Sequence, residues 1–168
     1  MSAVLQMRLK AHLEEALRPI LLLGQSDAGD VECAAQVFIG DMPPKRQNRA
    51  KPGQPPSDDS GRNLPCVVIV PVTGRQEDGE SVTTVALICV VYNPQSRDAE
   101  AAEADLAVML STVTGALAPC ANGEPLARRF NLEADSRGRL LPWVKSEAQP
   151  RPFLQATMTS IWRYRGWE

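Results

Sequence analysis

The chain has 168 residues, of which 43% are apolar and 23% are charged, and its formal net charge is −2. A chain of this length fits a single domain (1–168), and a domain of roughly 150 residues buries about 68–70% of its unfolded surface without needing a disulfide or a structural metal. The charge argues against a domain-wide nucleic-acid interface, which would be basic. The N-terminus lacks the pattern of a signal peptide, and the apolar runs are shorter than a membrane span, so we expect a soluble protein with no membrane partner.

The chain opens with a predicted helix from Ala3 to Arg18, which Pro19 ends because proline disfavours the α conformation of the preceding residue. Gly24 to Gly29 are interpreted as a turn. A first strand is then predicted from Val31 to Ile39, where alternate residues are apolar. The helix is expected to bury one broad apolar face, made of Val4, Met7, Leu9, Ala11, Leu13, Ala16 and Leu17.

The segment from Asp41 to Asn63 differs from the rest of the chain. It contains five prolines and two glycines and almost no apolar side chains. Such a composition cannot bury enough surface to offset its ordering entropy, so it predicts a long mobile loop within the domain. The loop contains a basic run, Lys45 to Lys51, which is either a solvated segment or an arm that meets an acidic surface or phosphates.

A central hairpin is predicted next, with strands from Pro65 to Val72 and from Val82 to Tyr92. Both faces of both strands are apolar, which is typical of strands that are covered on both sides. The turn is placed within Thr73 to Ser81. Its charged tip, Gly74 to Glu80, is expected to be exposed, with the strands extending past the core as a ribbon.

The clearest element is an amphipathic helix from Asp98 to Leu117, with acidic residues in its first two turns that complement the helix dipole. A short strand at Arg128–Ala134, an apolar cluster at Leu140–Val144 and a final strand at Phe153–Tyr164 follow. The order α-β-β-β-α-β-β predicts an α+β fold, with a mainly antiparallel sheet of about four to five strands, a central hairpin and two packing helices. The buried stripe of the second helix is predicted to be Ala102, Leu106, Met109, Leu110, Val113 and Leu117.

No group of residues has the spacing of an active site. His12 is the only histidine and has no carboxylate or cysteine at ligand spacing, so it is interpreted as a helix-surface residue. Cys33, Cys66 and Cys89 lie in apolar runs and are expected in the core. Phosphate-binding glycine motifs are absent, and Asp58-Asp59 lie in the proline-rich loop. We therefore predict no catalytic, cofactor-binding or metal-binding residue, and no enzymatic activity.

Four patterns occur in a recognisable order. They are the Pro-plus-apolar run Leu64–Val70, the apolar run Ile88–Asn93 that ends in Tyr, the amphipathic helix Asp98–Leu117, and the strand from Pro152-Phe153 to Trp162. In this order the chain resembles the tail terminator and tail-completion (minor tail) proteins of tailed bacteriophages and prophages. The resemblance covers most of the chain, but it consists of apolar patterns and not of fixed catalytic residues.

The resemblance implies a structural virion protein that is assembled in the host bacterial cytoplasm and lies at the neck end of the tail. Such proteins form a homo-oligomeric ring, typically a hexamer, that caps the tail tube, stops its elongation and joins it to the head connector. The implied partners are the tail tube and head connector proteins. The lumen of such a ring can admit DNA without sequence-specific contacts.

A closed ring needs two different surfaces on each subunit, because its contacts are head-to-tail. We expect the charged loop and the hairpin tip to supply some of these contacts. The alternatives are another neck or baseplate protein, such as a head–tail connector, and a small α+β ligand-binding module, which would need a concave polar pocket. The candidate contact residues are Lys45, Arg46, Arg49, Lys51, Arg75, Glu77 and Asp78.

Overall fold

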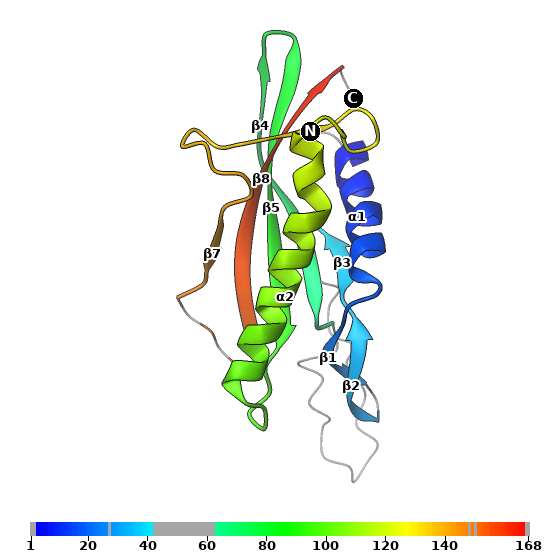
Figure 1. The fold of residues 1–168 in the computed structure, drawn as a ribbon, viewed down its shortest axis with the longest axis vertical. Coiled ribbons are helices and arrows are strands. Elements are labelled where there is room, and N and C mark those ends of the chain that lie inside the picture. The colour runs from blue at the N-terminus through cyan, green and yellow to red at the C-terminus, as the bar shows by residue number, and fades with distance from the viewer. Residues whose placement is uncertain (1–2, 27, 42–62, 148, 150, 167–168) are drawn as a thin grey trace.

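The computed structural model describes residues 3–26, 28–41, 63–147, 149 and 151–166 (Figure 1). Strands β3 to β8 form one sheet in the order β3-β4-β5-β8-β6, with β7 also paired to β8, and β1 and β2 form a separate hairpin. The fold is α+β, and its sheets are mainly antiparallel, as predicted. The elements are α1 (Ala3–Leu17), β1 (Leu21–Ser26), β2 (Gly29–Ala34), β3 (Gln36–Ile39), β4 (Cys66–Glu77), β5 (Glu80–Tyr92), α2 (Ala99–Leu117), the 3₁₀ helix η1 (Ala118–Ala121), β6 (Asn131–Glu133), β7 (Trp143–Lys145) and β8 (Phe153–Arg165).

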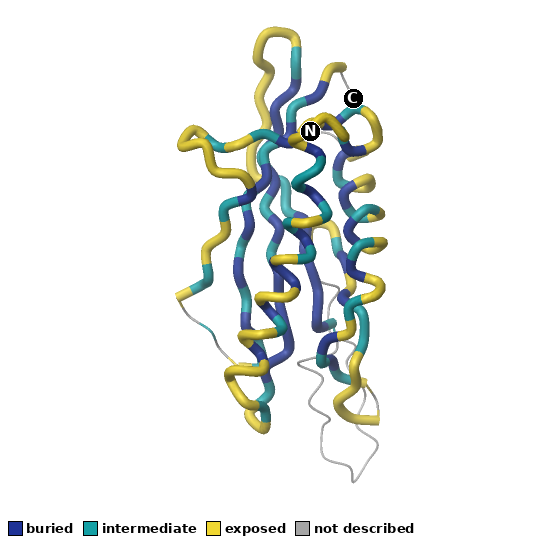
Figure 2. The backbone as a smooth tube through the Cα atoms, viewed as in Figure 1, coloured by how far each residue is buried: buried dark blue, intermediate teal, exposed yellow. Residues whose placement is uncertain are grey.

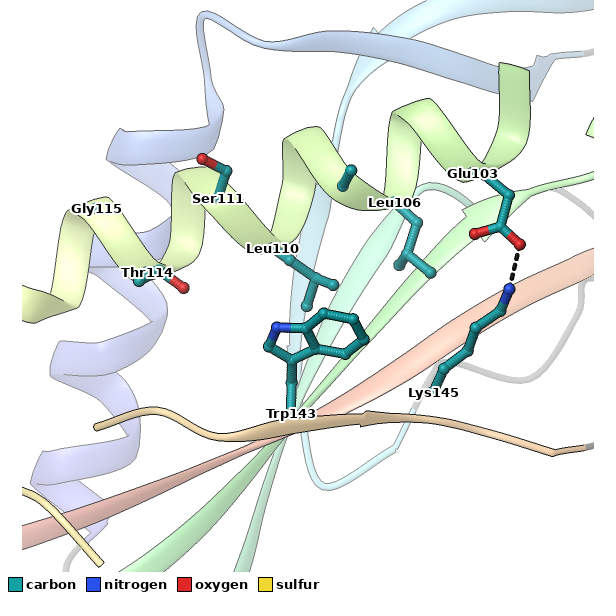
Figure 3. Close-up of a pocket in the computed structure, with 9 residues that line it drawn as sticks. Glu103, Leu106, Leu110, Ser111, Thr114, Gly115, Trp143 and Lys145 are labelled. Carbon is teal, nitrogen blue, oxygen red and sulfur yellow. Dashed lines mark hydrogen bonds and ion pairs between the residues drawn. The ribbon is translucent and has the colours of Figure 1, made fainter. Parts of the chain in front are cut away.

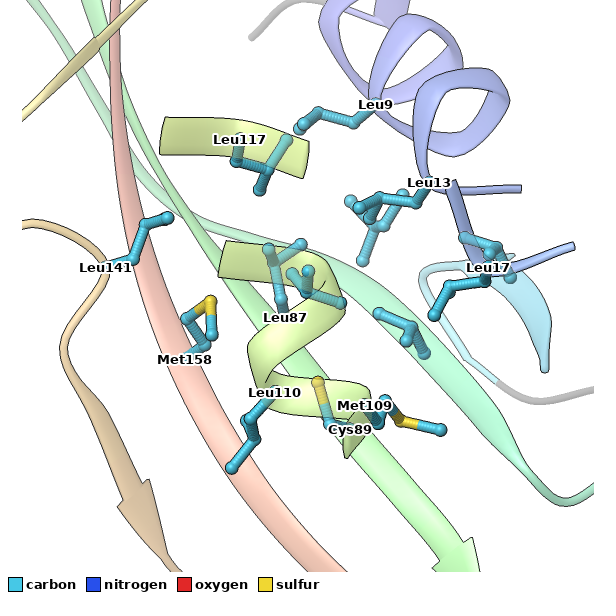
Figure 4. Packing of buried hydrophobic residues seen from close by; sticks show 14 of the residues in the cluster. Leu9, Leu13, Leu17, Leu87, Cys89, Met109, Leu110, Leu117, Leu141 and Met158 are labelled. Carbon is cyan, nitrogen blue, oxygen red and sulfur yellow. The ribbon is translucent and has the colours of Figure 1, made fainter. Parts of the chain in front are cut away.

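Both helices lie side by side against one face of the large sheet, and the main core fills the space between these two layers (Figures 1 and 4). In α1 the buried residues are four leucines spaced four apart, which is the period of one helix face. The predicted stripe of α1 was therefore wrong in part, since Met7 is 66% exposed. The four leucines are Leu5, Leu9, Leu13 and Leu17.

Helix α2 follows its prediction closely. The six residues of the predicted stripe are the six that it buries. Asp98 is the N-cap, and its carboxylate accepts a hydrogen bond of 3.1 Å from the backbone N–H of Glu100. An N-cap oxygen satisfies a backbone donor that has no partner within the helix, so it fixes where the helix begins.

The central hairpin is longer than predicted. Glu77 pairs with Glu80, so the turn contains only two residues, Asp78 and Gly79. Both have positive φ, 52° and 79°, which is the conformation of a type I′ turn and the reason that Asp-Gly favours this connection. The upper part of the hairpin projects beyond the helices and is mostly exposed (Figure 2).

Two predictions near the N-terminus were wrong. Gly24 to Ser26, within the segment interpreted as a turn, belong instead to strand β1, which pairs with β2 from Leu21↔Ala34 to Ser26↔Gly29. The single strand predicted at Val31–Ile39 is divided at Ala35, so that β2 joins the small hairpin and β3 runs parallel to β4. A strand that changes partner keeps its alternating pattern, so the pattern alone did not reveal the division.

The second face of the sheet is only partly covered. A small cluster of Leu64, Cys66, Val68, Val90 and Tyr92 is buried there, and Leu23 of β1 packs against it. Farther along, Val70 and Ile88 are half-buried. Within the described residues of this single chain, the second face is therefore buried only at the end beside the β1–β2 hairpin.

The C-terminal strands differ from the prediction mainly in extent. Strand β8 buries its even-numbered residues, which alternate with half-buried ones. Strand β6 is shorter than predicted, and β7 is an additional strand within the predicted apolar cluster. That cluster does not cover the second face: Leu141 joins the main core, and Trp143 faces α2 (Figure 3).

Candidate assembly surface

The predicted tip residues lie together at the end of the β4–β5 ribbon. Arg75 Nη2 lies 3.5 Å from Glu77 Oε2, and both side chains are largely exposed. Asp78 is the first residue of the turn. The other predicted contacts, Lys45, Arg46, Arg49 and Lys51, lie outside the described residues.

A charge network at the base of the tip was missed by the sequence analysis. The guanidinium of Arg163 on β8 donates hydrogen bonds to Glu133 (2.5 Å), Glu77 (3.1 Å) and Glu80 (3.4 Å), and Arg165 Nε donates to Glu80 (2.9 Å). One cation thus links β4, β5, β6 and β8. Three bonds to one guanidinium restrain the ribbon more than separate surface ion pairs would.

The network affects the titration of its members. The hydrogen bond from Arg165 lowers the pKa of Glu80, with a further contribution from Arg163. The hydrogen bonds to Glu133 and Glu77 raise the pKa of Arg163. The Glu80 carboxylate and the Arg163 guanidinium therefore stay charged at neutral pH and keep their hydrogen bonds at this end of the ribbon.

A second feature is an apolar groove between α2 and β7, with a volume of about 520 Å³ (Figure 3). Trp143 is 52% exposed and stands over Leu106 and Leu110 of the helix. Glu103 and Lys145 close one end with an ion pair to each other. Because these two charges neutralise each other, the groove offers an apolar surface with little charge selectivity.

The exposed side of α2 extends this apolar surface. Its sequence has no Asp, Glu, Lys, Arg or His from Leu106 through η1. By length and composition, Ala99–Ala121 is the single helix among the described residues that could cross a membrane, and 33% of its most apolar window is buried. Since α2 also packs on the sheet, its composition indicates an unusually apolar outer surface for a helix of this fold.

The described residues hold no cluster of side chains that could bind a metal ion. Cys66 and Cys89 are buried, as predicted, whereas the core prediction was wrong for Cys33, which is only half-buried. Burial raises the pKa of the Cys66 and Cys89 thiols to about 12, so both stay protonated and unreactive. His12 is half-buried, and its Nε2–H donates to the Ala116 carbonyl at 2.8 Å. It therefore links α1 to α2 and is more than a surface residue.

Partial signals for the missed features were present in the sequence. Arg163 lies in the predicted strand Phe153–Tyr164 and Arg165 directly follows that strand, and acidic residues flank the hairpin turn, which suggests cross-strand pairing. The groove had no such signal, because it depends on how β7 docks on β8. Compared with known proteins, the chain matches none of the family models, and none of the curated proteins is similar enough to count as a relative.

Proposed function

We propose that this chain is a structural protein of the phage-tail terminator class, which forms a ring on the end of the tail tube. The resemblance in the order of its apolar patterns suggests this class. In the proposed role the ring, typically of six copies, stops growth of the tube and joins it to the head connector. DNA passes through the lumen without base-specific contacts.

The observation that carries the proposal is the β4–β5 ribbon. A two-stranded ribbon is weak on its own, but here β8 and the Arg163 network support it close to its tip. The tip presents charges of both signs, Arg75, Glu77 and Asp78, and a pocket of about 380 Å³ lies beside it, lined by residues of β4, β5 and β8. A rigid projection of mixed charge suits register-specific contact with another protein, since complementary charges contribute more to specificity than to affinity.

Deleting the gene from the genome that encodes it tests this function. We expect tail tubes of uncontrolled length that do not join to heads, because nothing would cap them. A copy of the gene supplied on a plasmid should restore tails of uniform length. Tails of normal length in the deletion strain, or a genome without tail tube genes, would contradict the proposal.

The same experiment separates the nearest alternative, a head–tail connector. Loss of a connector leaves filled heads and tails of normal length that fail to join. The second alternative, a small ligand-binding module, is favoured by the groove beside Trp143, whose volume lies within the roughly 300–1,000 Å³ of small-molecule sites. Binding of one apolar dye molecule per chain, abolished in Trp143→Ala, would favour that module.

A further inference from the structure

We propose that the two edges of the large sheet join in neighbouring copies, with β3 of one copy pairing antiparallel to β7 of the next. This inference rests on the proposed ring and adds which surfaces form it. It commits to a second copy of this chain as the occupant of the groove beside Trp143.

The first argument is the position of exposed apolar side chains. Strands β3 and β7 lie at opposite sides of the sheet (Figure 1). Ile39 on β3 is 38% exposed and Trp143 on β7 is 52% exposed. Large exposed apolar residues occur in the elements at each edge: Val4 and Met7 on α1, Leu21 and Val31 on the β1–β2 hairpin and Ile39 on β3 at one edge, and Leu140, Trp143 and Val144 in or beside β7 at the other.

The second argument is the register. Ile39 pairs with Ile69, Ile69 with Leu87, Leu87 with Met158, and Met158 with Trp143. The two exposed residues are thus the ends of one row that crosses the whole sheet. If the two ends of one row meet, each copy is not displaced along the strand direction relative to its neighbour. Repeated displacement would produce an open helical filament, so its absence favours a closed ring.

The third argument concerns backbone hydrogen bonds. Gln36 N–H and Gly40 N–H both donate to β4, so by alternation the backbone groups of Val37 and Ile39 point away from it. At the other edge, Pro142 O accepts from β8 and Ser146 N–H donates to β8, so the groups of Trp143 and Lys145 point outward. Within the described part of the chain, no strand pairs with either outer edge.

The outward backbone groups of β3 and those of β7 have the same spacing along their strands. The row next to the Ile39 row runs from Val37 through Val67, Cys89 and Ala156 to Lys145. Strand β3 runs antiparallel to β7. Two hydrogen-bonded antiparallel pairs, Ile39 with Trp143 and Val37 with Lys145, therefore form between copies without a change in register.

The pairing also completes the groove. Helix α1 packs on β3, on the same side of the sheet as α2. When β3 of a neighbour joins β7, the neighbour's α1 approaches the open side of the groove. Trp143 is then enclosed between two helices, and the uncharged outer face of α2 loses contact with water. Apolar burial of this kind is the main driving force of association.

A cross-linking experiment tests the pairing. In a Cys33→Ser background, the full chain carries Ile39→Cys and Trp143→Cys together. The Cα atoms of a hydrogen-bonded antiparallel pair lie about 5.5 Å apart, a distance that a disulfide spans. Mild oxidation should produce a ladder of dimers, trimers and higher oligomers that reductant reverses.

Controls make the result specific. Each single variant should stay monomeric on a non-reducing gel, because the contact joins two different edges. The matched pair Ile39→Cys with Asp78→Cys, whose second cysteine lies at the tip, should form no ladder. Absence of a ladder in the main pair, or dimers of Trp143→Cys alone, would overturn the pairing.

The result is independent of the test of function. A ladder from a chain whose deletion leaves tails normal would uphold the pairing and refute the terminator role. Uncapped tails in the deletion strain, with no ladder from the cysteine pair, would uphold the role and refute the pairing.

Discussion

The two faces of the large sheet are built from the same long strands, yet they are covered differently. On the helix side, Leu87, Cys89 and Met158 are fully buried beneath α1 and α2. On the opposite side, Ile88 and Thr157 of the same strands are only half-buried, and the β1–β2 hairpin contributes cover at one end. Period-2 patterning can therefore show that both faces are apolar without showing that both are covered.

The largest expected effect comes from truncating the helix-side core. Leu87→Ala removes a fully buried side chain beneath both helices and should lower the free energy of unfolding by about 2–5 kcal/mol. Ile88→Ala, the next residue on the other face, should cost less than half as much because its side chain is already partly in water. Urea unfolding of both variants measures how far each lowers the free energy of unfolding. Equal decreases would contradict the difference in burial between the two faces of the sheet.

A second substitution tests the cover of the opposite face. A Cβ at Gly24 would lie 2.5 Å from Cys33 Sγ and 2.7 Å from the Leu64 carbonyl oxygen, so Gly24→Ala should cost about 1–3 kcal/mol through overpacking. The control is Gly115→Ala on α2, where no atom lies within 4 Å and the better helix former should stabilise by about 0.5–1 kcal/mol. Thermal unfolding compares the Tm values of the two variants. An unchanged Tm for Gly24→Ala would show that the β1–β2 hairpin does not pack closely against the sheet.

Buried polar groups should show the same asymmetry. Ser160 Oγ donates to the Val85 carbonyl and accepts from Trp162 Nε1, both at 2.9 Å, in the helix-side core. Ser160→Ala leaves the indole N–H without this acceptor and should cost about 1–3 kcal/mol. Thr159→Ala, on the half-buried face, should change stability by less. Denaturant midpoints of the two variants measure their losses of stability. A larger loss of stability for Thr159→Ala than for Ser160→Ala would contradict the assignment of Ser160 to the buried face.

The smallest expected effect concerns the charge network, which holds the ribbon on the second face. Because the pKa of Glu80 is lowered in the fold, its contribution to stability is present above its ordinary value of 4.5 and is lost as the pH falls through the lowered value. Wild type should thus exceed Glu80→Gln in Tm at neutral pH, and the two should converge in acid. A gap that widens as the pH falls would contradict this sign. Salt should narrow the gap at neutral pH.

Local sequence patterns predicted the helices and strands whose own residues carry a long and regular signal. Helix α2 has a long stripe and an N-cap, and β8 has strict alternation over its length. The sequence missed β1 and β7, since short apolar runs are strands only when a partner strand lies beside them. It also missed Arg163, whose three carboxylate partners come from distant parts of the chain. The exposed position of Arg75, Glu77 and Asp78 at the hairpin end could be predicted, but the groove beside Trp143 required the tertiary arrangement.

The most direct test of the central claim is the length of tail tubes grown in the presence of this chain. Purified tail tube protein from the same genome is allowed to polymerise with increasing amounts of the purified full chain, and tube lengths are measured by electron microscopy. The account predicts that tubes become shorter as the chain is added and that a ring appears at one end of each tube. Tubes of unchanged length, with no chain bound at their ends, would contradict it.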